Sequence, residues 1–290
     1  MISQEEILSS VDHLPGLGSS FARISELGRD ESSELEDYAR VVESDPALAG
    51  NLLRLANSAE FGLARQVDSA AQAVAVLGTR RVLSVALATA LRGVIPGELA
   101  GYGIDARDFW RHCIAVGVLA QELGQEAGLG MEEECFLAGL LHDIGKLVTS
   151  TYLAREAPAL LKGLRREQLA LVEAERAVLG VDHTEVGSAV AERWDLPPGI
   201  GFVARWHHHP GSREGEDGGD EILRAVTEAV HVADCLAHAL GYGTDIGELS
   251  REIDAASMER LGASPPLLER IAGRSIPEIE ERTRLLEEGK

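Results

Sequence analysis

Histidine and aspartate residues gather in the middle of this sequence in a pattern that suggests metal chemistry. Eight of the nine histidines lie between residues 112 and 238. Imidazole is the commonest neutral metal ligand in proteins, and carboxylates complete such sites. A hard divalent metal, or an iron or manganese pair, would account for the whole set, since it would activate water and hold a phosphoryl oxygen. The candidate ligands are His112, His142, Asp143, His183, His207, His208, His209, His231, Asp234 and His238.

The most compact group lies in the segment LLHDIGK, residues 140–146. We expect it on a helix whose apolar stripe leaves His142, Asp143 and Lys146 on a different face. That face carries the small residues Ala138 and Gly139, so a second helix or a ligand can approach closely. Lys146 could then neutralise a phosphate. The alternative is that Asp143 pairs with Lys146 at i,i+3 on a solvated face while His142 is a core side chain.

The other histidines have similar alternatives. His112 lies one turn after Asp108, so the two could share a face, but it could also be a surface residue of its helix. His183 begins a predicted helix next to the capping candidate Asp182, and could be only a first-turn residue. In the segment RWHHHP, adjacent side chains diverge, so at most two of the three histidines can serve one site.

One further predicted helix, around residues 229–240, carries two histidines and an aspartate among apolar residues. In AVHVADCLAHAL, the residues His231, Asp234 and His238 fall at i, i+3 and i+7 on one face. An unpaired buried carboxylate is costly, so Asp234 is the member of this set whose burial most requires a partner.

The elements that position these residues are predicted to be helices throughout. Residues 36–58 form two helices broken at Asp45-Pro46, where aspartate can cap and proline suits the first turn. Residues 70–93 are predicted to form another pair of helices, broken at Leu77-Gly78. Asp105 can cap a long helix that ends at Gly128, and residues 131–153 are predicted to form the next helix. No period-two alternation is long enough to predict a strand. Residues 208–221 are predicted to form an exposed polar loop.

Composition narrows the class of protein. The chain has 290 residues with a formal net charge of −21, which repels phosphate backbones and argues against general nucleic-acid binding. Its three cysteines lie in apolar helical contexts and form no CxxC pattern, so we expect buried free thiols. The longest apolar run, residues 82–91, is too short to span a bilayer, and no signal peptide is visible. These features predict a cytoplasmic protein without a membrane partner.

The order of His112, then His142-Asp143, then Asp234 resembles the H…HD…D signature of the HD phosphohydrolase superfamily. The segment from 41 to 87, with DPALA, LLRLANSA and a later LG, strongly resembles the opening of the HDOD family. LPGLGSS (14–20), FWRHC (109–113) and HTEVGSAVAERWDLPPGI (183–200) also fit. The resemblance covers roughly residues 10–245.

This resemblance implies an all-α fold in which a helical N-terminal subdomain packs on an HD-like helical core. We expect the N-terminal subdomain over residues 1–103, the metal-binding core over 104–245, and a C-terminal helical extension over 246–290. That extension could cap the core or mediate formation of a homo-oligomer. HDOD proteins are generally taken as bacterial signalling modules, and many have lost the HD ligands that this sequence keeps.

The sequence is also similar to HD-GYP cyclic-dinucleotide phosphodiesterases at further positions. The similarity implies further ligands at His183, His207 and His208 and a phosphate-contacting role for Lys146. Some of these enzymes also use an acidic residue four positions before the first histidine, and Asp108 stands at that position. The GYP motif itself is missing, and the acidic loop that replaces it would repel a dinucleotide.

Three functional hypotheses follow. The first is an HDOD signalling protein that binds partner proteins or a nucleotide and carries a divalent metal. The second is an active phosphohydrolase acting on a nucleotide or small phosphoester, with Asp143 and Lys146 at the catalytic centre. In it, one ion would bind His112, His142, Asp143 and Asp234, and a second would bind His183, His207 and His208. The third is a scaffold without metal, in which the histidines only pack.

Overall fold

The computed structural model describes residues 3–58, 61–167, 169–211, 221–243 and 252–287. These residues are overwhelmingly helical, so the predicted all-α class is confirmed. The strands among them are β1 (Glu98–Leu99) and β2 (Ile104–Asp105), which pair antiparallel. The sequence did not predict this pair, because two residues per strand are too few to show an alternating pattern.

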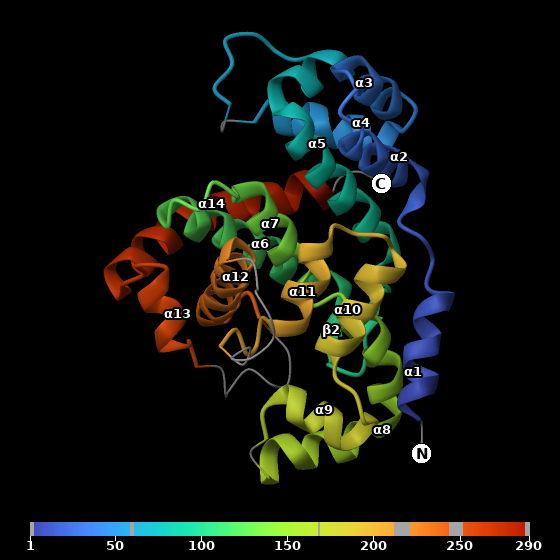
Figure 1. The fold of residues 1–290 in the computed structure, drawn as a ribbon, viewed down its shortest axis with the longest axis vertical. Coiled ribbons are helices and arrows are strands. Elements are labelled where there is room, and N and C mark those ends of the chain that lie inside the picture. The colour runs from blue at the N-terminus through green and yellow to red at the C-terminus, as the bar shows by residue number, and fades with distance from the viewer. Residues whose placement is uncertain (1–2, 59–60, 168, 212–220, 244–251, 288–290) are drawn as a thin grey trace. The chain divides into compact units, whose positions relative to one another are not determined.

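The chain divides into two compact units, which we describe separately. Unit 1 comprises Met1–Leu14 and Pro96–Ile279, and unit 2 comprises Pro15–Ile95 and Glu280–Lys290. The helices of unit 2 are α2 (Gly18–Arg29), α3 (Leu35–Glu43), α4 (Pro46–Ala56) and α5 (Ala70–Val94). Unit 1 holds α1 (Gln4–Ser10), the 3-10 helix η1 (Val11–His13), α6 (Ala106–Glu126), α7 (Glu132–Leu141), α8 (Lys146–Arg166), α9 (Leu171–Leu179), α10 (His183–Arg193), α11 (Pro198–Trp206), α12 (Glu221–Ala239) and α13 (Ala255–Arg260). The last helix is α14 (Pro265–Glu287), whose residues up to Ile279 belong to unit 1 and the rest to unit 2. Figure 1 labels these elements.

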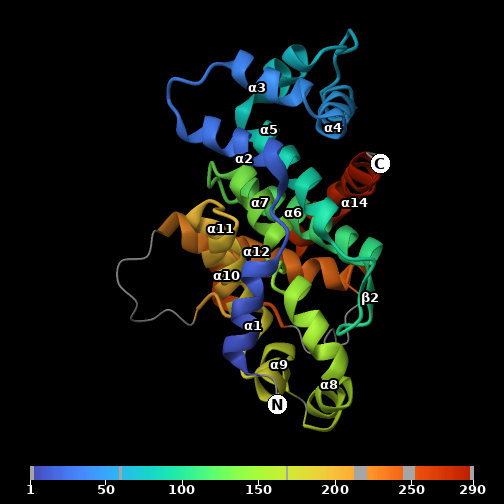
Figure 2. The same ribbon diagram turned by 90° about the vertical axis from the view of Figure 1, so that its right-hand side faces the viewer.

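In unit 2, α2, α3 and α4 all pack against α5 (Figure 2). Both helix breaks predicted there are confirmed. The Asp45 side chain accepts hydrogen bonds from the backbone N–H groups of Ala47 and Leu48, and Pro46 opens α4. Gly78 interrupts α5 with a φ of 76°, a left-handed conformation that glycine adopts without strain.

Helix α5 is the one helix of the described residues that is long and apolar enough to cross a membrane. Of its most apolar 18-residue window, 44% is buried inside the protein, and Gly78 divides the helix into two segments.

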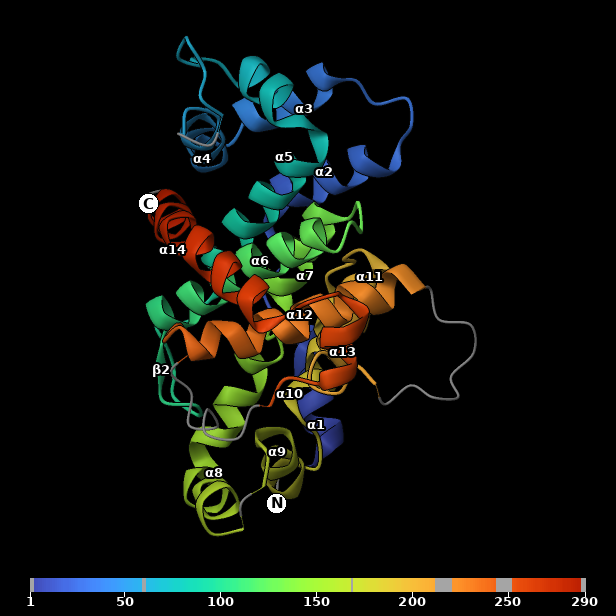
Figure 3. The ribbon, with the colours of Figure 1, turned by 90° about the vertical axis from the view of Figure 1, so that its left-hand side faces the viewer.

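In unit 1, α6, α7 and α12 pack against one another and form the centre of the unit (Figure 3). Helices α6 and α7 approach closely because two glycines face each other. A Cβ atom on Gly139 would lie 2.8 Å from the Gly117 Cα. The small face predicted around Gly139 therefore admits a second helix, which brings the end of α7 beside α6. The three cysteines are buried and free, as predicted.

The prediction of one continuous helix over residues 131–153 is wrong. Helix α7 ends at Leu141, α8 begins at Lys146, and residues 142–145 form the turn between them. The physical reason is a tertiary contact at Gly145, since a Cβ atom there would lie 1.9 Å from the His183 carbonyl oxygen. Packing of this turn on the start of α10 overrides the local helical preference.

Two further predictions concern the later part of the chain. The polar loop predicted over 208–221 falls mostly on residues 212–220, which lie outside the described residues. The C-terminal segment predicted to be helical over 246–290 contains α13 and one long helix, α14. Pro277 is accommodated inside it.

Candidate metal centre

The structure brings all seven predicted metal ligands together inside unit 1. They come from three helices and two connecting segments, and six of the seven are buried. His112 lies on α6, His142 and Asp143 lie in the α7–α8 turn, His183 begins α10, His207 and His208 directly follow α11, and Asp234 lies on α12. His208 is half-buried.

The two oxygens of Asp143 face different sets of imidazoles. Its Oδ1 lies 3.3 Å from Nε2 of His183 and 3.7 Å from Nε2 of His207. Its Oδ2 lies 3.3 Å from Nε2 of His142 and 3.7 Å from Nε2 of His112. One carboxylate is thus placed between two groups of nitrogen donors, which is the position of a bridging ligand.

A second carboxylate has a similar environment. The Oδ1 atom of Asp234 lies 3.4 Å from Nε2 of His112 and 3.7 Å from Nε2 of His142. It also lies 3.5 Å from Nε2 of His238, one turn further along α12. The carboxylate that the sequence showed to need a partner therefore faces three imidazoles.

These separations fit metal coordination. Two ligands bound about 2.0–2.1 Å from a tetrahedral ion are roughly 3.3–3.4 Å apart, close to the nitrogen–oxygen distances around both aspartates. Four groups of the cluster have ligand atoms that all lie within 4.8 Å of one another. These groups are Asp143 with His183, His207 and His208; His112 with His142 and Asp143; His142 with His207 and Asp234; and His112 with Asp234 and His238.

The histidine rings are held so that Nε2 points into the cluster. Nδ1 of His142 lies 2.7 Å from the Gly139 carbonyl oxygen, and Nδ1 of His207 lies 3.0 Å from that of Ala204. A carbonyl only accepts, so each Nδ1 carries the proton and each Nε2 keeps its lone pair. The Nε2 atom of buried His207 has no hydrogen-bond partner among the described residues, as a nitrogen reserved for a metal would require.

His183 is oriented by a residue that the sequence analysis did not single out. Its Nδ1 donates to Glu175 Oε2 at 2.7 Å, and its backbone N–H donates to the same oxygen at 2.8 Å. The hydroxyl of Tyr102 donates to Glu175 Oε1 at 2.7 Å. Glu175 is fully buried. The sequence feature that could have revealed Glu175 is its place on the apolar face of α9, between Val172 and Leu179.

Burial and neighbouring charges set the ionisation of the cluster. Burial opposes the charge of Asp143, but His142 and Lys146 hold the pKa of this carboxyl well below its usual value. Burial lowers the pKa of His112 and brings that of His207 well below its usual value. For His183 burial acts in the same direction, but Glu175 overcomes it and raises the pKa. An ionised Asp143 beside the neutral imidazoles of His112 and His207 is a donor set that divalent metals take.

Lys146 is part of the same centre. Its ammonium lies 2.7 Å from Asp143 Oδ2 and 5.3 Å from the centre of the Tyr102 ring, and the residue is only 1% exposed. The i,i+3 ion pair considered for this segment therefore exists, but inside the protein rather than on a solvated face. A buried lysine therefore places a positive charge beside a candidate metal ligand.

Three other residues considered in the sequence lie outside the ligand groups. His231 contacts the backbone, since its Nδ1 donates to the His207 carbonyl at 2.8 Å and its Nε2 accepts from the Asp254 N–H at 3.0 Å. It belongs to none of the four ligand groups, and neither do Asp108 and the exposed His209. His231 instead supports the turn that carries His207.

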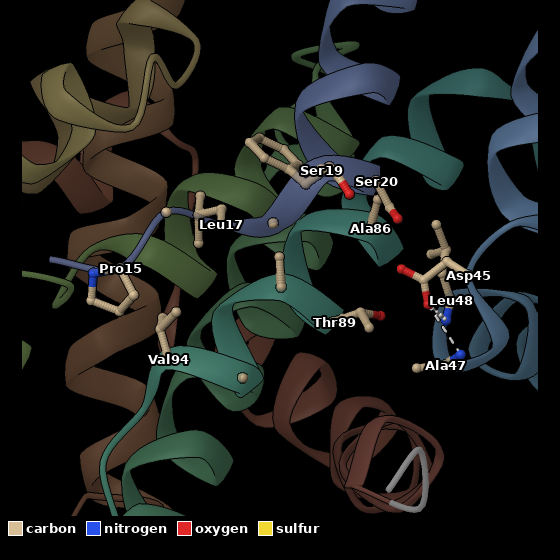
Figure 4. Close-up of a pocket in the computed structure, with 15 residues that line it drawn as sticks. Pro15, Leu17, Ser19, Ser20, Asp45, Ala47, Leu48, Ala86, Thr89 and Val94 are labelled. Carbon is tan, nitrogen blue, oxygen red and sulfur yellow. Dashed lines mark hydrogen bonds between the residues drawn. The ribbon is translucent and has the colours of Figure 1, made fainter.

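Unit 2 contains a cavity of about 470 Å³, between the start of α2 and one side of α5 (Figure 4). Apolar and small side chains line most of it, together with Ser19, Ser20, Asp45 and Thr89. None of the predicted site residues contributes to it. Asp45 is occupied in capping α4, and Thr89 in hydrogen bonds with Asn51 and Val85.

The fold and the buried cluster define a class, the helical proteins with a candidate His/Asp metal centre. The model of the HDOD domain matches residues 14–210, so this chain belongs to the HDOD family. An uncharacterized protein from Treponema pallidum (strain Nichols) is 29% identical over 215 residues. The match covers 70% of this chain but only 39% of that relative's length.

Solved structures show the same fold. An HDOD domain protein of unknown function from Geobacter sulfurreducens aligns over 99% of this chain and 96% of its own, with a TM-score of 0.74 and 22% identity. A protein from Shewanella amazonensis SB2B, provisionally named a phosphohydrolase, aligns over 97% of both chains with a TM-score of 0.71 and 25% identity. The recognition of the family from sequence is confirmed.

Proposed function

We propose that this protein is a metal-dependent phosphohydrolase that holds two divalent transition-metal ions, iron or manganese, in its HD core. The observation that carries the proposal is the placement of Asp143 between two sets of imidazole Nε2 atoms. Two carboxylate oxygens that each face a separate set of imidazoles fit a pair of ions better than a single ion. The substrate class is a nucleotide or a small phosphoester.

Each group of residues has a separate task in this proposal. Asp143, His183, His207 and His208 would hold one ion, and His112, His142, Asp143 and Asp234 the other. Metal ions bound there supply Lewis-acid activation of water and of a phosphoryl oxygen. Lys146 keeps Asp143 ionised and offers a cation to the phosphate. Glu175 and the backbone carbonyls of Gly139 and Ala204 hold the rings in the ligating tautomer.

One observation favours a second function, a regulatory module that signals through partner proteins. His142, Asp143, His183 and His207 are completely buried, and half-buried His208 is the most exposed member of its ligand group. A metal enclosed in this way could serve the stability of the fold rather than turnover. In that case the output would run through protein surfaces in the cytoplasm.

The experiment that separates these functions combines metal content with hydrolysis. The protein is purified anaerobically without a histidine tag, and its metals are measured by elemental mass spectrometry. Hydrolysis of bis(p-nitrophenyl) phosphate and of nucleoside phosphates is then assayed with Mn²⁺ or Fe²⁺. We expect metal-dependent turnover that the double variant His142→Ala/Asp143→Ala loses, while the exposed His13→Ala variant keeps it. Bound metal without hydrolysis of any phosphoester would contradict the enzyme and favour the regulatory module.

A further inference from the structure

His238 lies beside the cluster and is not part of the H…HD…D signature. It follows Asp234 by four residues on α12, so both side chains point from the same face of the helix. Its side chain is 7% exposed. The ring centroids of His238 and His112 are 4.9 Å apart.

The His238 ring is turned so that Nε2 faces the metal centre. Nε2 lies 3.5 Å from Asp234 Oδ1, a distance similar to those between that oxygen and the Nε2 atoms of His112 and His142. The Nδ1 side of the ring packs on the backbone of Gly243, where an added Cβ atom would lie 1.9 Å from Nδ1. The orientation matches that of His142, His183 and His207, whose Nε2 atoms point inward.

We propose that His238 is a metal ligand, which binds through Nε2 the same divalent ion as His112 and Asp234. The three donors form one ligand group, with two imidazoles and one carboxylate. This donor set suits Fe²⁺, Mn²⁺ or Co²⁺, which accept nitrogen and oxygen ligands together. The metal site therefore extends along α12 beyond the aspartate of the signature. The inference rests on the proposed metal centre, but not on turnover.

Gly243 is the positioning residue for this ligand. It approaches His238 so closely that any side chain at position 243 would displace the imidazole. The segment after α12 thus holds the ring against the cluster by packing. The substitution Gly243→Ala keeps the His238 imidazole but moves it, which separates the effect of position from the effect of chemistry.

The test measures Co²⁺ binding to the metal-free full-length protein by isothermal titration calorimetry and by visible absorption of the bound ion. We expect His238→Ala to weaken one Co²⁺ binding step by at least about tenfold and to change the absorption spectrum, because loss of a ligand should cost no less than loss of an outer-shell partner. His238→Gln, whose amide oxygen can occupy the place of Nε2, should recover part of the affinity. Gly243→Ala should weaken the same step.

Two matched controls accompany these variants. His13→Ala removes an exposed histidine, and Gly97→Ala adds a methyl group where nothing lies within 4 Å. Both should bind Co²⁺ as the wild type does. Circular dichroism checks that each variant is folded, and if His238→Ala is not, His238→Gln and Gly243→Ala decide the question.

The outcomes separate this inference from the enzyme proposal. Unchanged Co²⁺ affinity and spectrum in the folded His238 and Gly243 variants would overturn the inference, and so would a wild type that binds no Co²⁺. Co²⁺ binding without phosphoester hydrolysis would overturn only the enzyme proposal.

Discussion

Nδ1 of His183 and the Glu175 carboxylate are joined by a 2.7 Å hydrogen bond inside the protein. The same Glu175 oxygen accepts the His183 backbone N–H at 2.8 Å, so the ring and the start of α10 are fixed by one acceptor. This pair leaves Nε2 of His183 directed at Asp143 Oδ1. A carboxylate behind a ligating imidazole raises its basicity and holds its orientation.

Replacing this carboxylate should weaken the metal centre without removing any ligand. We expect Glu175→Gln to lower metal affinity by about 10- to 100-fold, the usual cost of losing an outer-shell partner. Calorimetric titration of the metal-free protein with Mn²⁺ checks this. Glu192→Gln, on the exposed end of α10, is the control and should bind normally. Equal affinity in both variants would show that Glu175 has only a structural role.

Metal affinity should fall as the pH falls, because imidazole must be deprotonated to bind an ion. Glu175 raises the pKa of His183, so protons compete at this ligand from a higher pH than the usual value of about 6.5. In Glu175→Gln this competition should move to lower pH, and the affinity difference from the wild type should shrink between pH 8 and pH 6. Mn²⁺ titrations at both pH values measure it. A difference that grows on acidification would contradict the assignment.

The α7–α8 turn depends on the absence of a side chain at position 145. Gly145→Ala would force a methyl group against the His183 carbonyl, so we expect destabilisation of about 1–3 kcal/mol, the usual cost of overpacking. Because the contact holds the turn against a ligand, metal affinity should fall as well. Urea unfolding and metal titration test both effects. The control Gly97→Ala, in open space, should change neither by a comparable amount.

Removing metal should lower the stability of the fold. An ion that binds only the folded chain contributes about 2.7 kcal/mol at a hundredfold excess over its dissociation constant. Thermal unfolding followed by circular dichroism should therefore show a lower midpoint after treatment with a chelator and dialysis, and recovery on adding Mn²⁺. In His142→Ala/Asp143→Ala the midpoint should not respond to Mn²⁺. A midpoint that ignores metal in the wild type would argue against a site in the folded protein.

Much of the fold followed from local patterns. The caps at Asp45 and Asp105 and the break at Gly78 were predictable because they depend on short-range hydrogen bonds and backbone conformation. The ending of α7 before His142 was not predictable, because it depends on the contact of Gly145 with a residue 38 positions later.

The same distinction applies to the site. The residue types and order of the HD signature marked the candidate ligands. The alternatives for each stayed open because spacing along the chain does not fix distances in space. Glu175 was overlooked since a single glutamate in an amphipathic helix is ordinary until its partner is known. His238 and His231 looked equivalent on α12, and only the tertiary structure shows that one faces Asp234 and the other the backbone of His207.

The central claim is that Asp143 bridges two metal ions, and electron paramagnetic resonance of the Mn²⁺-loaded protein tests it most directly. The metal-free chain is titrated with Mn²⁺, and spectra are recorded for the wild type and for Asp143→Asn, with His13→Ala as the control. The account predicts the spectrum of an exchange-coupled Mn²⁺ pair in the wild type and the control, and its loss in Asp143→Asn. Only isolated Mn²⁺ signals in the fully loaded wild type, or a coupled pair that survives Asp143→Asn, would contradict it.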